Sequence, residues 1–291
     1  MAGKYSSITS EDLIAGYRAA GSKKGCAKLM HMPWSSFRDL WEKRIGDAKI
    51  EQVSKKATHK VGVISDLHYG SKYSCPEEVR DFVDHCVEEG VKTILIGGDI
   101  SDGLQMRKGH ANEVFLQGID EIVEYVAAEL PERAEIEYYA ITGNHDNALV
   151  KLCGVDLGMQ IAKERADFHY MGYTKSSVVI DGNVLAFLYH GAGNCTQNRT
   201  VRLQSKVQQT VESCITHKLP IPEVYLLGHC HHSSVVYGYY GSLAIGLASF
   251  QRQTPYLAEK GLMPDVGGII LEYVSDGVGL LQTPKIEFKR Y

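Results

Sequence analysis

Short apolar runs alternate with amphipathic stretches along the chain from Lys60 onward. The runs are rich in β-branched residues and have the length of buried strands. They lie at residues 61–64, 93–96, 138–142, 184–189 and 224–227. Such alternation of strand-like and helix-like segments is typical of a layered α/β or α+β domain. The pattern therefore predicts an α/β fold for most of the chain.

The first 44 residues have a helical pattern instead. Apolar side chains recur at spacings of three and four residues from Leu13 to Ala20, which predicts a helix over residues 11–20 with Ser10 as its N-cap. A second helix is expected over residues 23–29. Pro33 opens a third helix that ends near Arg44.

Each of the five apolar runs is followed by residue types that bind metal ions. The motifs, in chain order, are Asp66-Leu-His68, Gly98-Asp99-Ile-Ser-Asp102, Gly143-Asn144-His145-Asp146, His190-Gly191 and Gly228-His229-Cys230-His231. Side chains at strand ends are held rigidly while they stay open to solvent, as a catalytic metal site requires. Mixed imidazole and carboxylate donors suit Mn²⁺, Fe²⁺, Zn²⁺, Co²⁺ or Ni²⁺, and they argue against Ca²⁺ or a thiolate zinc site.

Each motif alone is weak evidence, but the ordered set resembles the pattern of the calcineurin-like metallophosphoesterases over residues 60–250. The resemblance implies a four-layer α/β/β/α sandwich with a dinuclear metal site at one edge. On this basis the strand-like run at residues 267–274 is expected to complete the second sheet.

The resemblance also implies a role for each motif residue. The implied metal ligands are Asp66, His68 and His231 for one ion, Asn144, His190 and His229 for the other, and Asp99 as the bridge. His145 would act as a general acid or as a clamp on the scissile phosphate, and Asp146 would orient the His145 ring by accepting a hydrogen bond. Asp102 has two open roles, to cap its loop or to hydrogen-bond a ligand. His110 matches no motif and is expected to be an ordinary residue.

Charge is distributed unevenly. Residues 1–60 carry twelve Lys and Arg against six Asp and Glu, whereas the rest of the chain carries 19 basic and 29 acidic side chains. We therefore divide the chain into an N-terminal module at residues 1–48, a polar linker at residues 49–59 and a catalytic domain at residues 60–291. Residues 25–40 resemble the helix-turn-helix of small DNA-binding modules. The third helix would then present Ser35, Ser36, Arg38 and Lys43 to DNA. A three-helix unit used for protein contacts remains the alternative.

These observations predict a phosphodiesterase that uses two divalent metal ions, with Mn²⁺ as the expected ion. A metal-activated hydroxide would attack the phosphorus of the ester. The motif Gly143-Asn-His-Asp146 is common among phosphodiesterases of the family, and no Arg follows Asp102 as in its protein phosphatases. The DNA-binding module favours a nuclease with DNA as its partner. A phosphatase or a small-nucleotide phosphodiesterase whose module serves assembly, and a DNA-binding regulator with an inactive body, remain as alternatives.

The composition is that of an ordinary globular protein, with 44% hydrophobic and 23% charged residues. No apolar run is long enough to cross a membrane, and the N-terminus lacks a signal-peptide core. The seven cysteines are scattered without CxxC spacing, which favours reduced thiols and a cytoplasmic location. The sequence does not decide whether the protein forms a homodimer.

Overall fold

The computed structural model describes residue 5 and residues 8–20, 23–45, 57–191, 199–277 and 279–291 of the 291-residue chain. It contains two compact units, which are residues 1–57 with 276–278 and residues 58–275 with 279–291. Most of the expected linker, residues 49–56, lies outside the described residues. Its last part is a strand, because β1 begins at Ala57. The first residues of β1 are exposed or half-buried, and only its last four residues are buried in the core. The apolar run in the sequence therefore begins later than the strand.

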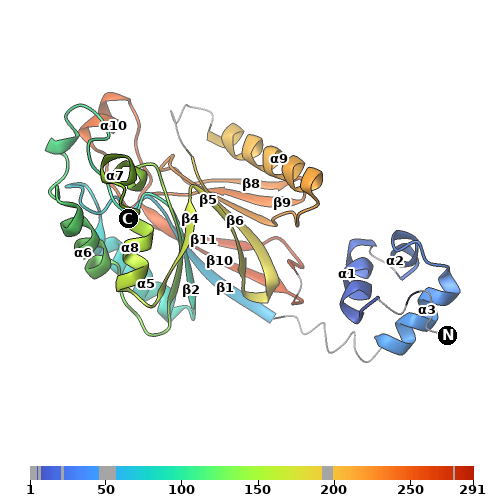
Figure 1. The fold of residues 1–291 in the computed structure, drawn as a ribbon. Coiled ribbons are helices and arrows are strands. Elements are labelled where there is room, and N and C mark those ends of the chain that lie inside the picture. The colour runs from blue at the N-terminus through green and yellow to red at the C-terminus, as the bar shows by residue number, and fades with distance from the viewer. Residues whose placement is uncertain (1–4, 6–7, 21–22, 46–56, 192–198, 278) are drawn as a thin grey trace. The chain divides into compact units, whose positions relative to one another are not determined.

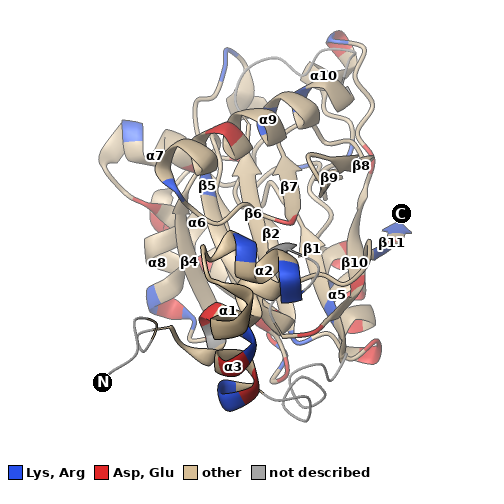
Figure 2. Ribbon diagram, turned by 90° about the vertical axis from the view of Figure 1, so that its right-hand side faces the viewer, with Lys and Arg blue, Asp and Glu red and all other residues tan. Residues whose placement is uncertain are grey.

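The small unit contains three helices at the predicted positions: α1 (Ser10–Ala20), α2 (Lys23–Leu29) and α3 (Trp34–Arg44). Leu13, Cys26, Phe37 and Trp41 form its buried centre. Figure 2 shows that α2 and α3 both contain Lys or Arg, and that α3 contains acidic residues as well. A helix-turn-helix at residues 25–40 would need Leu29 as an apolar anchor beside the turn, but Leu29 has 55% of its surface exposed and does not serve as one.

The N-cap of α1 is Thr9 rather than Ser10. Thr9 Oγ1 accepts a hydrogen bond from the Asp12 amide (3.1 Å), and the Asp12 carboxylate accepts one from the Thr9 amide (2.7 Å). This reciprocal pair is a capping box. Ser10 is already helical, and its hydroxyl donates to the carbonyl of Arg44 at 3.3 Å. Because Thr and Ser are both good caps, the sequence did not distinguish the two positions.

The large unit is built on two sheets (Figure 1). The first has the order β11-β10-β1-β2-β3-β4 and the second the order β5-β6-β7-β9-β8. The strands are β1 (Ala57–Ile64), β2 (Thr93–Gly97), β3 (Glu137–Thr142), β4 (Phe168–Tyr173), β5 (Lys175–Ile180), β6 (Val184–His190), β7 (Val224–Gly228), β8 (Ser234–Tyr239), β9 (Ser242–Gly246), β10 (Gly267–Ser275) and β11 (Lys285–Arg290). Strands β1 to β4 pair in parallel, as do β6, β7 and β9.

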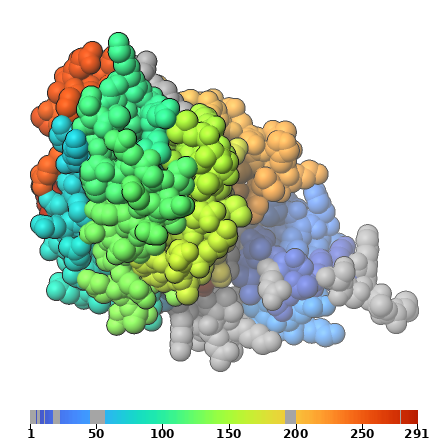
Figure 3. All heavy atoms as spheres, turned by 60° about the vertical axis from the view of Figure 1, so that its left-hand side comes forward, coloured from blue at the N-terminus to red at the C-terminus, as the bar shows by residue number. Residues whose placement is uncertain are grey.

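Helices cover the outer faces of both sheets, so the unit has the expected α/β/β/α layers. The helices are α5 (Pro76–Glu88), α6 (Ile119–Glu129), α7 (Asp146–Cys153), α8 (Leu157–Glu164), α9 (Arg199–His217) and α10 (Pro255–Glu259), with short 3₁₀ turns at His110–Asn112 and Asp181–Asn183. Figure 1 shows α5, α6 and α8 on one side of the sandwich and α9 on the other. Figure 3 shows the face that the first group covers, with residues from α6 to α8 in green.

The alternation of side chains along each strand explains these layers. Val61 and Val63 of β1 pack between the two sheets, whereas Ile64 packs under the helices of the first sheet. In β7, Leu226 joins the core between the sheets and Tyr225 packs under α9. Both faces of these strands are therefore apolar, as expected for parallel strands that helices cover.

The strand at residues 267–274 lies in a different sheet from the one expected. It forms β10 beside β1 in the first sheet. Ile269 and Leu271 face the core between the sheets, and Ile270 faces the helices. The apolar pattern predicts that the strand is covered on both faces, but it does not say which sheet the strand joins.

Cys26, Cys75, Cys86, Cys153 and Cys214 are free thiols, as expected. Cys230 differs, because it is disulfide-bonded. Scattered cysteines without a spacing motif gave no sign of this pairing. Within the described part of the chain, no helix combines the length and the apolar character that a membrane span requires.

Candidate active site

The five motifs meet at one edge of the sandwich. Three of them follow the carboxyl ends of parallel strands β1, β2 and β3 in the first sheet, and two follow β6 and β7 in the second. Hydrogen bonds between the strand ends join the sheets there. Nδ1 of His190 donates to the carbonyl of Gly97 at 2.8 Å, and the His229 amide donates to the Asp66 carboxylate at 3.0 Å. The strand ends therefore place motifs from distant parts of the sequence side by side.

The first group of candidate ligands is Asp66, His68 and His231, whose donor atoms all lie within 4.8 Å of one another. Nε2 of His231 lies 3.1 Å from Oδ1 of Asp66 and 3.1 Å from Nε2 of His68. Ser65 Oγ donates to the other Asp66 oxygen at 2.5 Å. All three residues are buried, with 9% or less of their surface exposed.

The second group is Asp99, His190 and His229. Nε2 of His190 lies 3.0 Å from Oδ2 of Asp99, and its ring is fixed by the bond from Nδ1 to Gly97. Oδ2 of Asp99 also lies 4.0 Å from Nε2 of His68 in the first group. The Asp99 carboxylate thus lies between the two groups, where a bridging ligand is expected.

Asn144 has a buried side-chain oxygen that needs a partner. Among the described residues, no donor reaches Oδ1 of Asn144. An unpaired buried amide oxygen costs about 1–3 kcal/mol, so such an atom indicates a missing ligand. A divalent ion would satisfy this oxygen, and the nitrogen and oxygen donors of both groups suit a first-row divalent metal.

Five of the seven sequence-predicted ligands have a left-handed backbone. The φ angles are +55° at Asp66, +47° at His68, +49° at Asp99, +83° at His229 and +51° at His231. Residues other than Gly seldom adopt this conformation, and it costs about 1–3 kcal/mol each where it is strained. Strained backbone is concentrated at functional sites, and five of the left-handed residues occur together in the strand-end loops, which supports a functional role for these loops.

Two glycines allow the loops to approach one another closely. A Cβ atom at Gly143 would lie 2.1 Å from Oδ1 of Asp99, and one at Gly98 would lie 2.4 Å from Nδ1 of His190. Gly98 also has a φ of +100°. No other residue type fits at these positions without moving Asp99 or His190.

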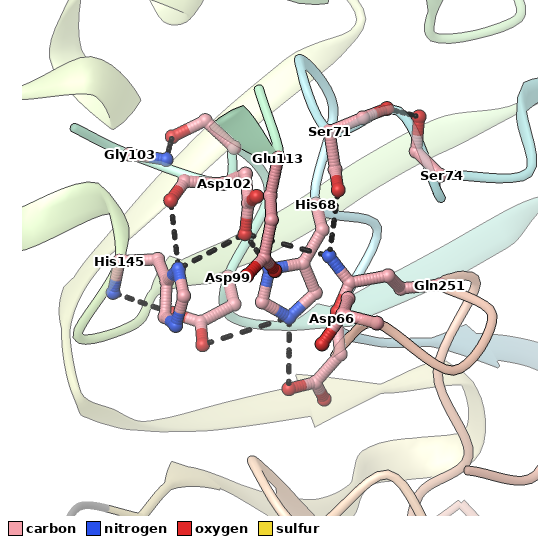
Figure 4. Close-up of polar contacts among 12 residues, drawn as sticks. Asp66, His68, Ser71, Ser74, Asp99, Asp102, Gly103, Glu113, His145 and Gln251 are labelled. Atoms are coloured by element: carbon pink, nitrogen blue, oxygen red, sulfur yellow. Dashed lines mark hydrogen bonds and ion pairs between the residues drawn. The ribbon is translucent and has the colours of Figure 1, made fainter. Parts of the chain in front are cut away.

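Asp102 connects the first group of candidate ligands to His145 (Figure 4). Its carboxylate accepts a hydrogen bond from Nδ1 of His68 at 2.7 Å and lies 3.2 Å from Nδ1 of His145. The carbonyl of Asp102 accepts the proton of Nδ1 of His145 at 2.7 Å. Because Nδ1 of His68 and Nδ1 of His145 each carry a proton that Asp102 accepts, Nε2 is the ring atom that could bind a metal ion or a substrate. Of the two roles open to Asp102, the structure therefore shows the hydrogen bond to a candidate ligand.

Asp146 does not orient His145, contrary to the sequence-based expectation. Its carboxylate accepts hydrogen bonds from the amides of Ser101 (2.8 Å), Gly143 (2.9 Å) and Ile100 (3.1 Å). It therefore ties the loop after β2 to the loop after β3. Asp146 is the first residue of helix α7, and its side chain is buried. The ring of His145 contacts Asp102 instead.

Burial and neighbouring charges shift several pKa values in the site. Burial alone would lower the pKa of His145, but the carboxylates of Asp99 and Asp102 raise it to about 9. Burial would likewise raise the pKa of Asp66, yet His231 and His190 lower it to about 2. Burial and then the charge of Asp99 raise the pKa of Asp146 to about 6. The site thus keeps its ligand carboxylates ionised and favours a proton on His145.

Sequence reasoning missed two residues beside Asp102. His110 is buried with Nε2 3.2 Å from Asp102 Oδ2, and Gln251 donates from Nε2 to Asp102 Oδ1 at 3.4 Å and to Ser71 Oγ at 3.0 Å. His110 follows no apolar strand, and Gln251 lies five residues beyond the end of the apolar strand β9. Their only signal is their residue type, so three-dimensional packing was needed to find them.

Comparison with known proteins agrees with the geometry. The family model described as calcineurin-like phosphoesterase matches residues 59–254, which contain all five motifs. The chain belongs to the calcineurin-like phosphoesterase family. This membership and the two groups of donor side chains define it as a phosphoesterase-family protein with a candidate centre for divalent metal ions.

The curated relatives are small subunits of DNA polymerase II. The chain is 25% identical over 255 residues to the protein from Methanothermobacter thermautotrophicus, covering 74% of this chain and 52% of that one. It is 32% identical over 104 residues to the protein from Archaeoglobus fulgidus, covering 32% of this chain and 21% of that one. The chain therefore spans about half the length of the first of these relatives, and less of the second.

Solved structures with similar folds include Vps29 from Entamoeba histolytica, crystallised with zinc. It has a TM-score of 0.39 and 16% identity and covers 79% of this chain and 98% of its own. A predicted phosphoesterase from Streptococcus pneumoniae has a TM-score of 0.37 and 14% identity and covers 80% of this chain and 99% of its own.

Proposed function

We propose that the protein is a metal-dependent phosphodiesterase that cleaves DNA. The observation that carries the proposal is the convergence of two donor groups on Asp99, with the unpartnered amide oxygen of Asn144 in the loop after β3 that contacts Asp99 through the His145 amide. Asp66, His68 and His231 would hold one ion, and Asn144, His190 and His229 the other. Two bound divalent ions, with Mn²⁺ as the expected metal, would supply a hydroxide nucleophile at neutral pH and neutralise the phosphate oxygens.

His145 is the proposed catalytic side chain. Asp102 holds its Nδ1 proton, so Nε2 is the atom that faces the reaction. Without metal, the carboxylates of Asp99 and Asp102 raise the pKa of His145, and the contact with Asp102 would help to keep a proton on the ring once Asp99 is occupied by metal. A protonated imidazole can hydrogen-bond a phosphate oxygen or donate its proton to the departing oxygen of the ester.

The small unit supports DNA as the substrate. Ser35, Arg38 and Lys43 are exposed on α3 and Ser36 is half-buried, so the face proposed to contact DNA is not used in the core of the unit. Lys and Arg neutralise DNA phosphates, which supplies sequence-independent affinity. The relatives named as DNA polymerase II small subunits support a place for this chain in DNA metabolism. A cytoplasmic location is part of the same proposal.

The test is hydrolysis in Mn²⁺ of bis-p-nitrophenyl phosphate and of labelled single-stranded and duplex DNA. We expect the wild-type protein to cleave both kinds of substrate and His145→Ala to lower kcat by about a hundredfold or more. Turnover of the small diester with intact DNA would contradict the nuclease proposal and favour a small-nucleotide phosphodiesterase. Absence of both activities in metal-loaded protein would contradict the enzymatic proposal.

DNA binding by the small unit is tested separately with the full-length protein. Arg38→Ala with Lys43→Ala should weaken binding to duplex DNA and reduce the salt dependence of the dissociation constant. Lys163→Ala, on α8 of the large unit, is the matched control. Equal affinity of the double variant and the control would contradict DNA contact through α3.

A further inference from the structure

A cavity of about 340 Å³ lies between α9 and the outer face of the second sheet. Its walls include Tyr189 and Leu227 from the sheet and Leu203 from α9. At one end it reaches the metal-binding loops, because Gly191 follows His190 and Gly228 and Cys230 flank His229. A cavity of this size is large enough for one small organic group.

Two cations line this cavity from the same face of α9. Arg202 and Lys206 are four residues apart, so they lie one above the other on the helix. The Lys206 ammonium lies 3.8 Å from the centre of the Tyr189 ring, and Nη1 of Arg202 donates to Sγ of Cys230 at 3.3 Å. Tyr189 and Cys230 thereby hold both charges at the cavity wall.

The cavity therefore favours an anion, although the chain after residue 60 has a net negative charge. Among the described residues that line it, there is no Asp or Glu, and its other polar side chains include Ser205 and Gln209. Apolar walls suit a sugar and a base, while the two cations suit a phosphate group. The metal-binding loops at its end are where the scissile phosphate is proposed to bind.

We propose that this cavity binds the nucleoside and the phosphate next to the scissile phosphate on an unpaired nucleic acid strand. The inference rests on the proposed phosphodiesterase function. A space of this volume matches a single nucleoside rather than a base pair, so the proposal requires that a duplex fray or expose an end before it is cleaved. Lys206 and Arg202 are the specificity-determining residues for the second phosphate.

The test compares two ligands on full-length protein in EDTA, so that no hydrolysis occurs. One is a thymidine dinucleotide without terminal phosphates, and the other carries a phosphate at each end. Isothermal titration calorimetry should show that the terminal phosphates tighten binding about tenfold, the effect of about one charge-assisted hydrogen bond. In Lys206→Ala this gain should fall below about twofold, and Lys206→Arg should restore most of it.

Lys285→Ala, which removes a surface lysine from β11 in the other sheet, should keep the full gain. An equal gain in Lys206→Ala and in wild type would overturn the inference, as would a failure of either dinucleotide to bind. Circular dichroism of each variant checks the fold.

Hydrolysis of bis-p-nitrophenyl phosphate by the same preparations in Mn²⁺ separates this inference from the proposed function. One outcome is that the terminal phosphates tighten binding only when Lys206 is present, but the protein hydrolyses no diester. This outcome would contradict the proposed function and support the cavity as an anion site. Hydrolysis combined with binding independent of Lys206 would contradict the cavity inference alone.

Discussion

The carboxylate of Asp102 accepts a hydrogen bond of 2.7 Å from Nδ1 of His68. This contact fixes the ring so that Nε2 points towards Asp66 and His231. Partners of this kind set the tautomer and basicity of a ligating histidine. The position of a candidate ligand thus depends on a residue that is not itself expected to touch the metal.

We therefore expect Asp102→Asn to weaken Mn²⁺ binding by about tenfold to a hundredfold. The amide keeps the shape of the side chain but loses the negative charge that holds the His68 proton. Calorimetric titration with Mn²⁺ measures the effect. Asp120→Asn, an exposed position on α6, serves as the control. If both variants bound Mn²⁺ like wild type, the positioning role of Asp102 would be wrong.

Asn144→Ala should reduce the metal content of the protein from two ions to about one. The variant removes the buried oxygen that has no protein partner among the described residues, while Asp66, His68 and His231 are retained. Elemental analysis after dialysis gives the stoichiometry. His145→Ala should keep both ions, because its proposed role is proton transfer and not ligation. Loss of metal in His145→Ala would count against this division of roles.

Asp146→Ala should destabilise the protein even without metal. Its carboxylate satisfies the amides of Ile100, Ser101 and Gly143, and their loss leaves buried donors unpaired. We expect a decrease of about 3 kcal/mol in the free energy of unfolding, measured by urea denaturation in EDTA. A change below about 1 kcal/mol would show that the loops do not need this carboxylate.

The two tryptophans give a probe of the small unit alone. Trp34 and Trp41 are the only two in the sequence, and both belong to α3. If residues 1–48 form a separate domain, unfolding followed by tryptophan fluorescence should occur at a different urea concentration from unfolding followed by circular dichroism. Coincident transitions would contradict independent domains. Lys285→Ala should leave the fluorescence transition unchanged, because Lys285 lies in the large unit.

Cys86 should make stability depend on pH above 9. Burial raises the pKa of its thiol from the usual 9.0 to about 12, because a thiolate is poorly solvated inside the protein. The thiol of the folded state thus stays protonated where that of the unfolded state ionises. The contribution of Cys86 to the free energy of unfolding is therefore fully present below pH 9, and it decreases as the pH rises towards 12. Urea unfolding of wild type and Cys86→Ala between pH 7 and 10 measures the difference. Parallel curves for the two proteins would contradict this account.

The apolar pattern predicted much of the fold because it follows directly from burial. Val61, Leu95 and Leu226 lie in strands that are covered on both faces, and such strands appear in the sequence as continuous apolar runs. The three N-terminal helices were predicted from their spacing for the same reason. The sheet that β10 joins was not predictable, since its apolar residues suit either sheet equally.

The site was predictable to the extent that it lies at strand ends. Asp66 and His68 follow β1 directly, and sequence order alone places them at the edge of the sheet. The partner of His145 was not predictable in this way. Asp146 is its neighbour in the sequence, yet Asp102 contacts its ring, because α7 begins at Asp146 and turns that side chain inward. Contacts between loops depend on backbone direction, which residue spacing does not specify.

The left-handed backbone of the candidate ligands affects how they should be mutated. Alanine at Asp66, Asp99 or His229 would lose a donor atom and would also have to adopt a φ angle that it disfavours. A loss of activity in such a variant would mix two causes. Asparagine tolerates this backbone better, so Asp99→Asn changes the charge with little added strain. The geometry of the loops therefore makes asparagine, and not alanine, the substitution that changes the charge of these candidate ligands with little added backbone strain.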